Sequence, residues 1–281
     1  SDLQFFGNQR LAGFELGVKY DRNHFAFGIN HSFLKLISFD WNKDLKDGSN
    51  KNNITLEAAE TIIAKAIPLL FQARTKRIYP GLDDKVLTSW NALMLKGYVD
   101  AYKAFGDANY LDAALKNAKF ITENMLQDDN RLNRNYKGGK SVINAFLDDY
   151  ALTAEAFTAL YEVTFDEKWL NKAKDLTDYT IEHFFDASSG MFYFTSDTDP
   201  ALIARKMVVS DNVIPASNSV MAKNLYRLGL YFYNNDYIDK SKQMMHNLKS
   251  NLIGNTQPSF YSNWLILYLD LVNPTFEVAV V

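Results

Sequence analysis

Apolar positions recur with a helical period from Asn53 almost to the end of the chain, and one pattern is written three times. Each copy is clearest around an aromatic anchor, Tyr110, Trp169 or Tyr237, and the anchors lie 59 (169 − 110) and 68 (237 − 169) residues apart. A second helix begins about 20 residues before each anchor. A repeat of about 60 residues is too long for the common short helical solenoids and fits a helical hairpin with a long loop. The sequence therefore predicts an array of αα-hairpins.

The predicted helices are joined alternately by short turns and long loops. Eight helices are expected, at residues 55–76, 87–105, 108–126, 144–164, 167–185, 215–234, 236–251 and 258–271. Short turns join the second to the third, the fourth to the fifth and the sixth to the seventh, whereas long loops follow the third and the fifth. In a ring of hairpins the long loops gather on one face, and loops of this length are usually functional. We therefore expect the starts of the inner helices to share one functional rim.

Two stretches depart from the helical pattern. Residues 1–52 are broken by Gly, Asn and Asp, and their segment Phe14 to Tyr20 alternates with a period near two. We expect an irregular N-terminal segment with one or two short strands, followed by a helical domain over residues 53–281. In the long loop before the sixth helix, residues 190–195 and 205–209 have the composition of a small β-hairpin.

Composition narrows the classes of function. A formal net charge of −3 over 281 residues gives no electrostatic case for nucleic acid or for an anionic membrane surface. The chain has no cysteine, its four histidines lack metal-ligand spacing, and it has no P-loop or dinucleotide-binding glycine motif. We therefore expect no metal and no cofactor. Because no apolar stretch reaches membrane-spanning length and no signal peptide is visible, we expect a soluble, cytoplasmic protein.

The first of three polar clusters, residues 82–91, lies at the start of the second helix. It holds two adjacent carboxylates, Asp83 and Asp84, together with a lysine, hydroxyls, Trp90 and Asn91. These groups suit the recognition of sugar hydroxyls, and a carboxylate here could act as acid or base. The alternative is structural: one of the two carboxylates caps the helix and pairs with Lys85.

The second cluster, residues 146–150, places Asp148 and Asp149 just inside the fourth helix and ahead of Tyr150. Paired carboxylates raise each other's pKa when they lie close together, which keeps a protonated acid available near neutral pH. The alternative is one Asp that interacts with the helix dipole and one that is exposed.

The third cluster, residues 210–219, opens the sixth helix with Asp211, Asn218 and several small polar groups. These groups could hydrogen-bond a ligand, or they could satisfy the free N–H groups of the helix. Repeated capping need not reproduce paired acids twice, so three clusters at equivalent positions of the repeat indicate a shared polar site.

The same clusters resemble a known family. The matching segments are residues 74–91, residues 146–152, and Asp211 with Ile214-Pro215 and Asn218-Ser219. They are similar to the C-terminal helical region of the thioredoxin-domain-containing family that includes spermatogenesis-associated protein 20, and the resemblance covers roughly residues 68–271. It implies an (α/α)6 toroid related to six-hairpin glycosidases and to N-acylglucosamine and cellobiose 2-epimerases, and therefore a carbohydrate-type site. The thioredoxin-like domain of that family is absent from this sequence.

We therefore expect an all-α fold in which αα-hairpins form a partial or complete (α/α)6 toroid, with a small β-hairpin in a long loop. Eight helices do not complete six hairpins, so residues 1–50, a missing N-terminal region or an oligomer would have to close the ring.

The leading hypothesis for function is a carbohydrate-active domain, glycoside hydrolase-like or epimerase-like, whose partner is a small sugar or oligosaccharide. Asp84 and Asp149 are the predicted acid/base residues. The residues predicted to support them or to bind the sugar are Asp83, Trp90, Asn91, Arg134, Asp148, Tyr150, Asp211 and Asn218. The alternative is a non-catalytic binding or scaffold domain of a thioredoxin-domain-containing protein.

Overall fold

The chain divides into two compact units. The computed structural model describes residues 15–20, 25–30, 38–39, 54–78, 81–200, 202–252 and 257–273. One unit comprises Ser1–Asp83 with Thr256–Ser259, and the other comprises Asp84–Asn255 with Phe260–Val281. The boundary predicted between residues 52 and 53 lies outside the described residues.

The described part of the first unit contains a small antiparallel sheet and the helix α2. Strands β1 (Glu15–Tyr20), β2 (Phe25–Asn30) and β3 (Ser38–Phe39) pair in the order β1-β2-β3, with Glu15 opposite Asn30. Strand β1 falls within the segment whose alternation predicted a strand. Helix α2 (Leu56–Thr75) begins where the Thr55 hydroxyl accepts a hydrogen bond from the Ala58 N–H at 3.1 Å, which satisfies a free donor of its first turn.

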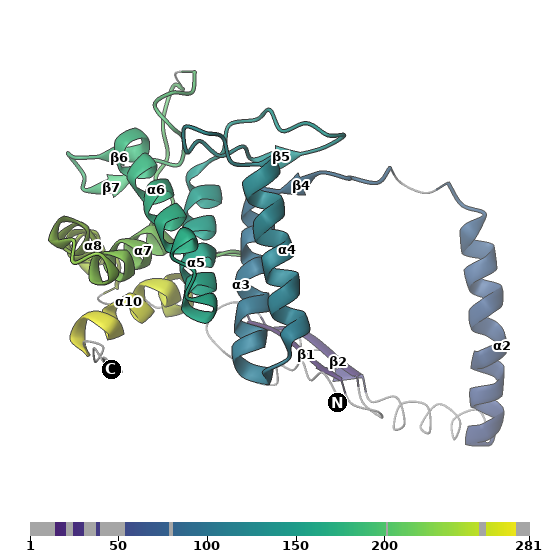
Figure 1. The fold of residues 1–281 in the computed structure, drawn as a ribbon. Coiled ribbons are helices and arrows are strands. Elements are labelled where there is room, and N and C mark those ends of the chain that lie inside the picture. Colours follow the sequence, from purple (N-terminus) through teal and green to yellow (C-terminus); the bar gives the residue numbers. More distant parts are fainter. Residues whose placement is uncertain are drawn as a thin grey trace. The chain divides into compact units, whose positions relative to one another are not determined.

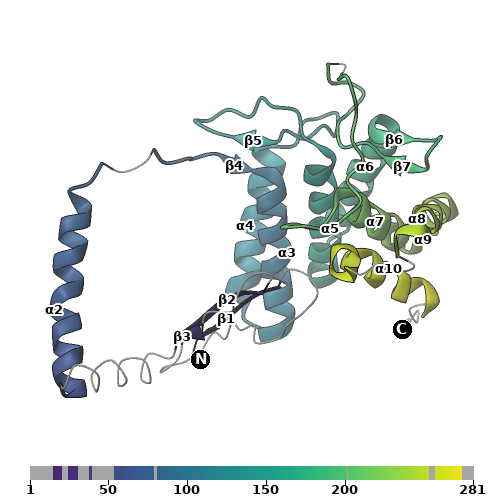
Figure 2. The same ribbon diagram turned by 180° about the vertical axis from the view of Figure 1, so that it is seen from behind.

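The second unit is built from helical hairpins. Its helices are α3 (Thr88–Phe105), α4 (Ala108–Asn124), α5 (Leu147–Thr164), α6 (Glu167–Phe184), α7 (Ser217–Tyr231), α8 (Asn235–Asn247), α9 (Lys249–Leu252) and α10 (Ser262–Val272), the last preceded by a 3-10 turn, η1 (Pro258–Tyr261). Helices α3 and α4, α5 and α6, and α7 and α8 form hairpins, and α5 packs between α3 and α7 (Figure 1). Helix α10 packs against α7 and α8 (Figure 2). The all-α hairpin array predicted from the repeat is confirmed as a partial toroid.

Burial separates inner helices from outer ones. In α5 every residue from Leu147 to Leu160 is buried, as expected for a helix enclosed by neighbours on all sides. The outer helix α4 buries only one stripe, formed by Ala114, Ala118 and Ile121. No helix in the described parts of the chain is both long and apolar enough to cross a membrane.

Each hairpin turn contains a residue in the left-handed conformation, which ends the inner helix. Gly106 occupies it after α3 with φ of 69°, Phe165 after α5 with φ of 55°, and Tyr233 after α7 with φ of 50°. Glycine adopts this conformation without strain, whereas the side chains of Phe and Tyr do not.

Two short strand pairs lie at the end of the unit opposite the hairpin turns. Strand β4 (Val86–Leu87) pairs with β5 (Asn135–Tyr136), and β6 (Phe185–Asp186) pairs with β7 (Met191–Phe192). All four lie at the same end of the unit (Figure 1).

The predicted β-hairpin exists, but its predicted second strand at residues 205–209 is wrong. Strand β7 pairs instead with β6, the segment that directly continues α6. The Asp186 carboxylate accepts hydrogen bonds from the Ser188 and Ser189 N–H groups, and Gly190 takes φ of 67°. This tight turn sets the β6–β7 register, and residues 205–209 form no strand, although the Phe194 N–H donates to the Lys206 carbonyl at 2.7 Å.

Candidate functional site

The candidate site is a rim formed by the N-terminal ends of α3 and α5 and the loop between α4 and α5. The β4–β5 pairing lays that loop across the start of α3 (Figure 1). The Thr88 N–H donates to the Arg134 carbonyl at 2.9 Å, and the Thr88 hydroxyl donates to the Asn133 carbonyl at 2.5 Å. These bonds hold Arg134 at the rim.

Asp149 connects the segments that form the rim. Its carboxylate is fully buried and accepts hydrogen bonds from the Ser89 N–H at 2.9 Å, the Phe146 N–H at 3.0 Å and Arg134 Nη1 at 2.9 Å. The first donor lies in α3, the second directly precedes α5, and the third belongs to the α4–α5 loop. One carboxylate therefore fastens three segments together.

Asp148 is the more accessible of the two carboxylates, with 8% of its side chain exposed. Its Oδ1 accepts from Arg134 Nη1 at 3.3 Å and from the Asp149 N–H at 3.0 Å. Oδ2 receives no hydrogen bond from the described residues. Arg134 is 25% exposed, and its guanidinium lies 4.6 Å from the centre of the Phe146 ring.

Burial changes the acidity of both carboxylates. Burial and, to a lesser extent, the charge of the nearby Asp148 raise the pKa of Asp149 to about 6, against the opposing effect of Arg134. Burial also raises the pKa of Asp148, again against the opposing charge of Arg134. The pair therefore holds protons at higher pH than free carboxylates do.

The first polar cluster joins this network through the Ser89 N–H, whereas its predicted site residues make other contacts. Asp84 is exposed, pairs with Lys137 at 2.5 Å, and makes no hydrogen bond or ion pair with the residues around Asp149. Asp83 is exposed and belongs to the other compact unit. Trp90 is exposed on the first turn of α3, and the half-buried Asn91 donates to the Leu87 carbonyl at 2.8 Å.

Tyr150 points into the core. Its hydroxyl accepts from the Leu132 N–H at 2.9 Å, and its ring stacks on Tyr179 with centroids 5.1 Å apart. Burial raises its pKa well above the usual range of a tyrosine.

The third polar cluster is also buried. Asp211 accepts from the N–H groups of Ala216 and Asn263, both at 2.9 Å, and so connects the start of α7 to α10. Asn218 bonds both backbone groups of Phe192 and the Val208 carbonyl, which fastens α7 to β7. Of the predicted residues, Arg134, Asp148 and Asp149 are brought together, while Asp211 and Asn218 make separate structural contacts.

Two buried hydroxyls were not singled out from the sequence. Ser89 Oγ, near the start of α3, and Ser217 Oγ, at the start of α7, are buried and have no hydrogen-bond partner among the residues that the structure describes. Serine is common at helix starts, so its presence in the sequence gave no signal of an unsatisfied group. Across the described ranges, no group of three or more metal-ligating side chains is placed to hold an ion.

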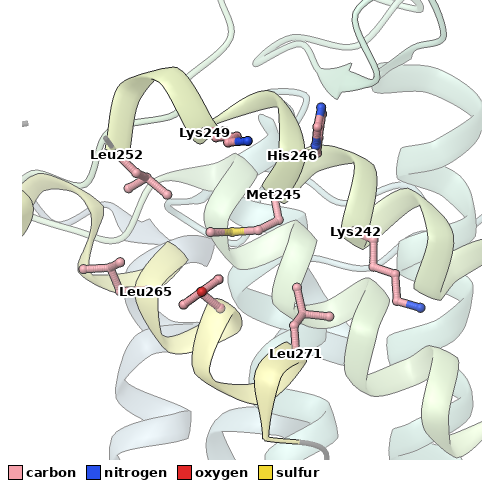
Figure 3. A pocket seen from close by; sticks show the side chains of 8 residues that line it. Lys242, Met245, His246, Lys249, Leu252, Leu265 and Leu271 are labelled. Atoms are coloured by element: carbon pink, nitrogen blue, oxygen red, sulfur yellow. The ribbon is translucent and has the colours of Figure 1, made fainter. Parts of the chain in front are cut away.

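A pocket of about 480 Å³ lies away from these residues, between α8, α9 and α10 (Figure 3). Met245, Leu252, Leu265 and Leu271 give it an apolar lining, with lysines at its edge. None of the predicted site residues lines it.

Comparison with solved structures defines the class of fold. The chain superposes on an α-mannanase from Bacteroides thetaiotaomicron with a TM-score of 0.53 and 16% identity, covering 69% of this chain and 55% of the other. A cellobiose 2-epimerase from Spirochaeta thermophila gives 0.53 and 12% identity over 69% and 56%, and an unsaturated glucuronyl hydrolase from Bacillus sp. GL1 gives 0.52 and 13% over 70% and 62%. The fold is therefore that of the α/α-toroid, six-hairpin glycosidase-like proteins.

Sequence comparison confirms the resemblance seen in the polar clusters. The chain is a homologue of human spermatogenesis-associated protein 20, with 33% identity over 198 residues, which is 66% of this chain and 25% of the relative. It is also 33% identical over 219 residues to an uncharacterized protein of Caenorhabditis elegans, covering 75% of this chain and 29% of that relative. The chain thus spans about a quarter of the length of the curated relatives that it matches. No family model matches the chain.

Proposed function

We propose that the helical unit binds a small sugar at the rim and acts on it through the Asp148 carboxyl. The observation that carries this proposal is the Arg134 guanidinium, which is partly exposed and donates to both Asp148 and Asp149. A partly exposed cation beside a carboxyl that has a raised pKa and is 8% exposed forms a pair of groups that a hydroxylated ligand can engage.

The proposal gives each residue a separate task. Asp148 keeps a proton to higher pH than a free carboxyl does and donates it to a sugar oxygen as a general acid. Asp149 is fully buried, so it positions Arg134 and does not meet the sugar. Trp90 offers an exposed ring for stacking against the sugar. Asp84, paired with Lys137, is left without a catalytic task.

The fold supports a sugar as the ligand by analogy. The proteins that share the fold are described as a mannanase, an epimerase and a glucuronyl hydrolase. Shared fold is an associational argument, so the site residues must carry the proposal.

A second candidate, sugar binding without turnover, is favoured by one observation. Glycoside hydrolysis uses two carboxyl groups on either side of the bond. In the described rim the carboxylate next to Asp148 is Asp149, which is buried and already accepts three hydrogen bonds. A binding domain needs no second carboxylate.

The experiment is an NMR assay of sugar binding and conversion. Mannose, cellobiose and α-mannobiose are incubated with the chain; anomeric proton signals report hydrolysis or epimerisation, and ligand line broadening reports binding. We expect Asp148→Asn to abolish conversion and to retain binding, while Asp84→Asn leaves both unchanged. Binding without conversion by the unaltered chain would favour the second candidate, and the absence of any binding would refute both.

A further inference from the structure

The pocket between α8, α9 and α10 is large enough to enclose a small molecule. Its volume of about 480 Å³ lies within the range of roughly 300–1,000 Å³ that is typical of ligand pockets. Figure 3 shows apolar side chains from all three helices around one space, namely Met245, Leu252, Leu265 and Leu271. The pocket therefore depends on how α10 packs against the preceding hairpin.

Part of the apolar lining is exposed. Leu265 and Tyr268 expose 37% and 49% of their surface, although Trp264 and Leu267 in the same helix are fully buried. Exposed apolar groups in a concave site favour an apolar ligand, because its binding removes both surfaces from water. A sugar suits this lining poorly, since Leu and Met side chains cannot donate hydrogen bonds to its hydroxyls. The pocket thus fits an apolar chain.

Basic side chains lie along one edge of the pocket. Lys242, His246 and Lys249 are four and three residues apart, which places them on one side of the α8–α9 segment. The dipole of α8 favours His246 in its last turn, but it does not account for Lys242, which lies before that turn. No acidic side chain lines the pocket, and neither lysine forms an ion pair with a residue that the structure describes. This edge therefore complements one anionic group.

We propose that the pocket binds a free medium-chain fatty acid. The acyl chain lies among Met245, Leu265 and Leu271, where each methylene that leaves water adds to the affinity. The carboxylate stays at the edge beside Lys242 and Lys249, so that its charge keeps contact with water. The pocket shares no lining residue with the rim, and the proposal does not rest on sugar binding there.

The test is an NMR titration of the chain labelled with ¹³C at its methionine methyl groups. Met245 lines the pocket, whereas the adjacent Met244 is fully buried and does not line it, so the second signal is an internal control. Met244→Leu and Met245→Leu assign the two signals. We expect decanoate to shift the Met245 signal saturably and to leave Met244 in place. Octanoate lacks two methylenes and should bind about tenfold more weakly.

Two variants separate the charge from the apolar lining. Lys242→Glu with Lys249→Glu should weaken the binding of decanoate by about five- to tenfold and leave that of decan-1-ol unchanged, because the alcohol carries no charge. Leu265→Gln should weaken the binding of both ligands. All three side chains are exposed, so the melting temperature of each variant should stay close to that of the unaltered chain.

Each variant has a matched control. Lys116→Glu with Lys119→Glu reverses the same number of charges on the exposed side of α4, away from the pocket. Ile266→Gln changes an exposed residue of α10 that does not line the pocket. Neither control should alter the affinity for decanoate.

Several results would overturn the proposal. One is a Met245 signal that decanoate does not shift, and another is equal binding of decanoate by the Lys242–Lys249 variant and the unaltered chain. A Met245 shift that follows protein concentration without ligand would identify a second copy as the occupant. Sedimentation with vesicles of phosphatidylcholine and phosphatidylglycerol, without a shift by decanoate, would identify a membrane surface.

Discussion

The Ser89 N–H donates to Asp149 Oδ1 at 2.9 Å, and this buried bond joins the starts of two helices that are 60 residues apart in the sequence. The same carboxylate holds Arg134 and caps α5 through the Phe146 N–H. The geometry of the rim therefore depends on one side chain.

Removal of this side chain should be among the most damaging changes to the rim. Asp149→Ala leaves two buried N–H donors and the Arg134 cation without their partner, so we expect a loss of about 3–5 kcal/mol in the free energy of unfolding. Asp149→Asn keeps an acceptor and should cost less. Urea denaturation measures both, and the exposed Asp84→Ala is the control that should leave the midpoint unchanged.

The raised pKa of Asp149 predicts a pH dependence of stability. The folded state binds this proton up to about pH 6, whereas the unfolded carboxyl releases it near the usual pKa of 3.8. The contribution is therefore fully present below about pH 4 and is lost as pH rises through about 6, by an amount on the order of 3 kcal/mol. The difference in unfolding free energy between the unaltered chain and Asp149→Asn, measured from pH 4 to 7, isolates this group. A difference that stays constant over that range would contradict the assignment.

Arg134 opposes the upward shift in the pKa of both carboxylates. Arg134→Gln should therefore raise both pKa values and move the loss of stability to higher pH. Carbonyl-carbon NMR of labelled aspartates follows each titration directly. A midpoint that stays in place would show that the guanidinium does not control the acidity of the pair.

Glycines in two inner helices should respond in opposite directions to the same change. A Cβ at Gly229 in α7 would lie 2.6 Å from Ile238 Cγ1 of α8, so Gly229→Ala should cost about 1–3 kcal/mol. A Cβ at Gly97 in α3 meets nothing within 4 Å, so Gly97→Ala should stabilise the chain by about 0.5–1 kcal/mol. Thermal melts compare the two, and similar effects of both changes would argue against the close packing of α7 on α8.

Most of the fold could be predicted from local patterns in the sequence. The anchors Trp169 and Tyr237 are buried, and Trp169 packs on Phe157 with ring centroids 5.2 Å apart, as the helical period predicts. The predicted partner of β7 was wrong because the choice between two nearby segments depended on the Asp186–Gly190 turn.

The arrangement of the site residues could be predicted less well from such patterns. Asp84 and Asp149 each belong to an adjacent pair of carboxylates, yet one is exposed beside Lys137 and the other is fully buried. The difference arises from Ser89 and Arg134, which reach Asp149 only through the tertiary fold. The cap that Asp149 forms at the start of α5 could not be recognised from the sequence, because the residue before the helix is Phe146 instead of the usual Ser or Thr.

The most direct test of sugar binding at the rim is an NMR titration of the ¹⁵N-labelled chain with cellobiose and α-mannobiose. We predict saturable shifts of the Trp90 indole and the Arg134 guanidinium signals. The Trp264 indole, which is buried and bonded to the Val209 carbonyl, should stay in place. Unchanged Trp90 and Arg134 signals up to the solubility limit of both sugars would contradict the account.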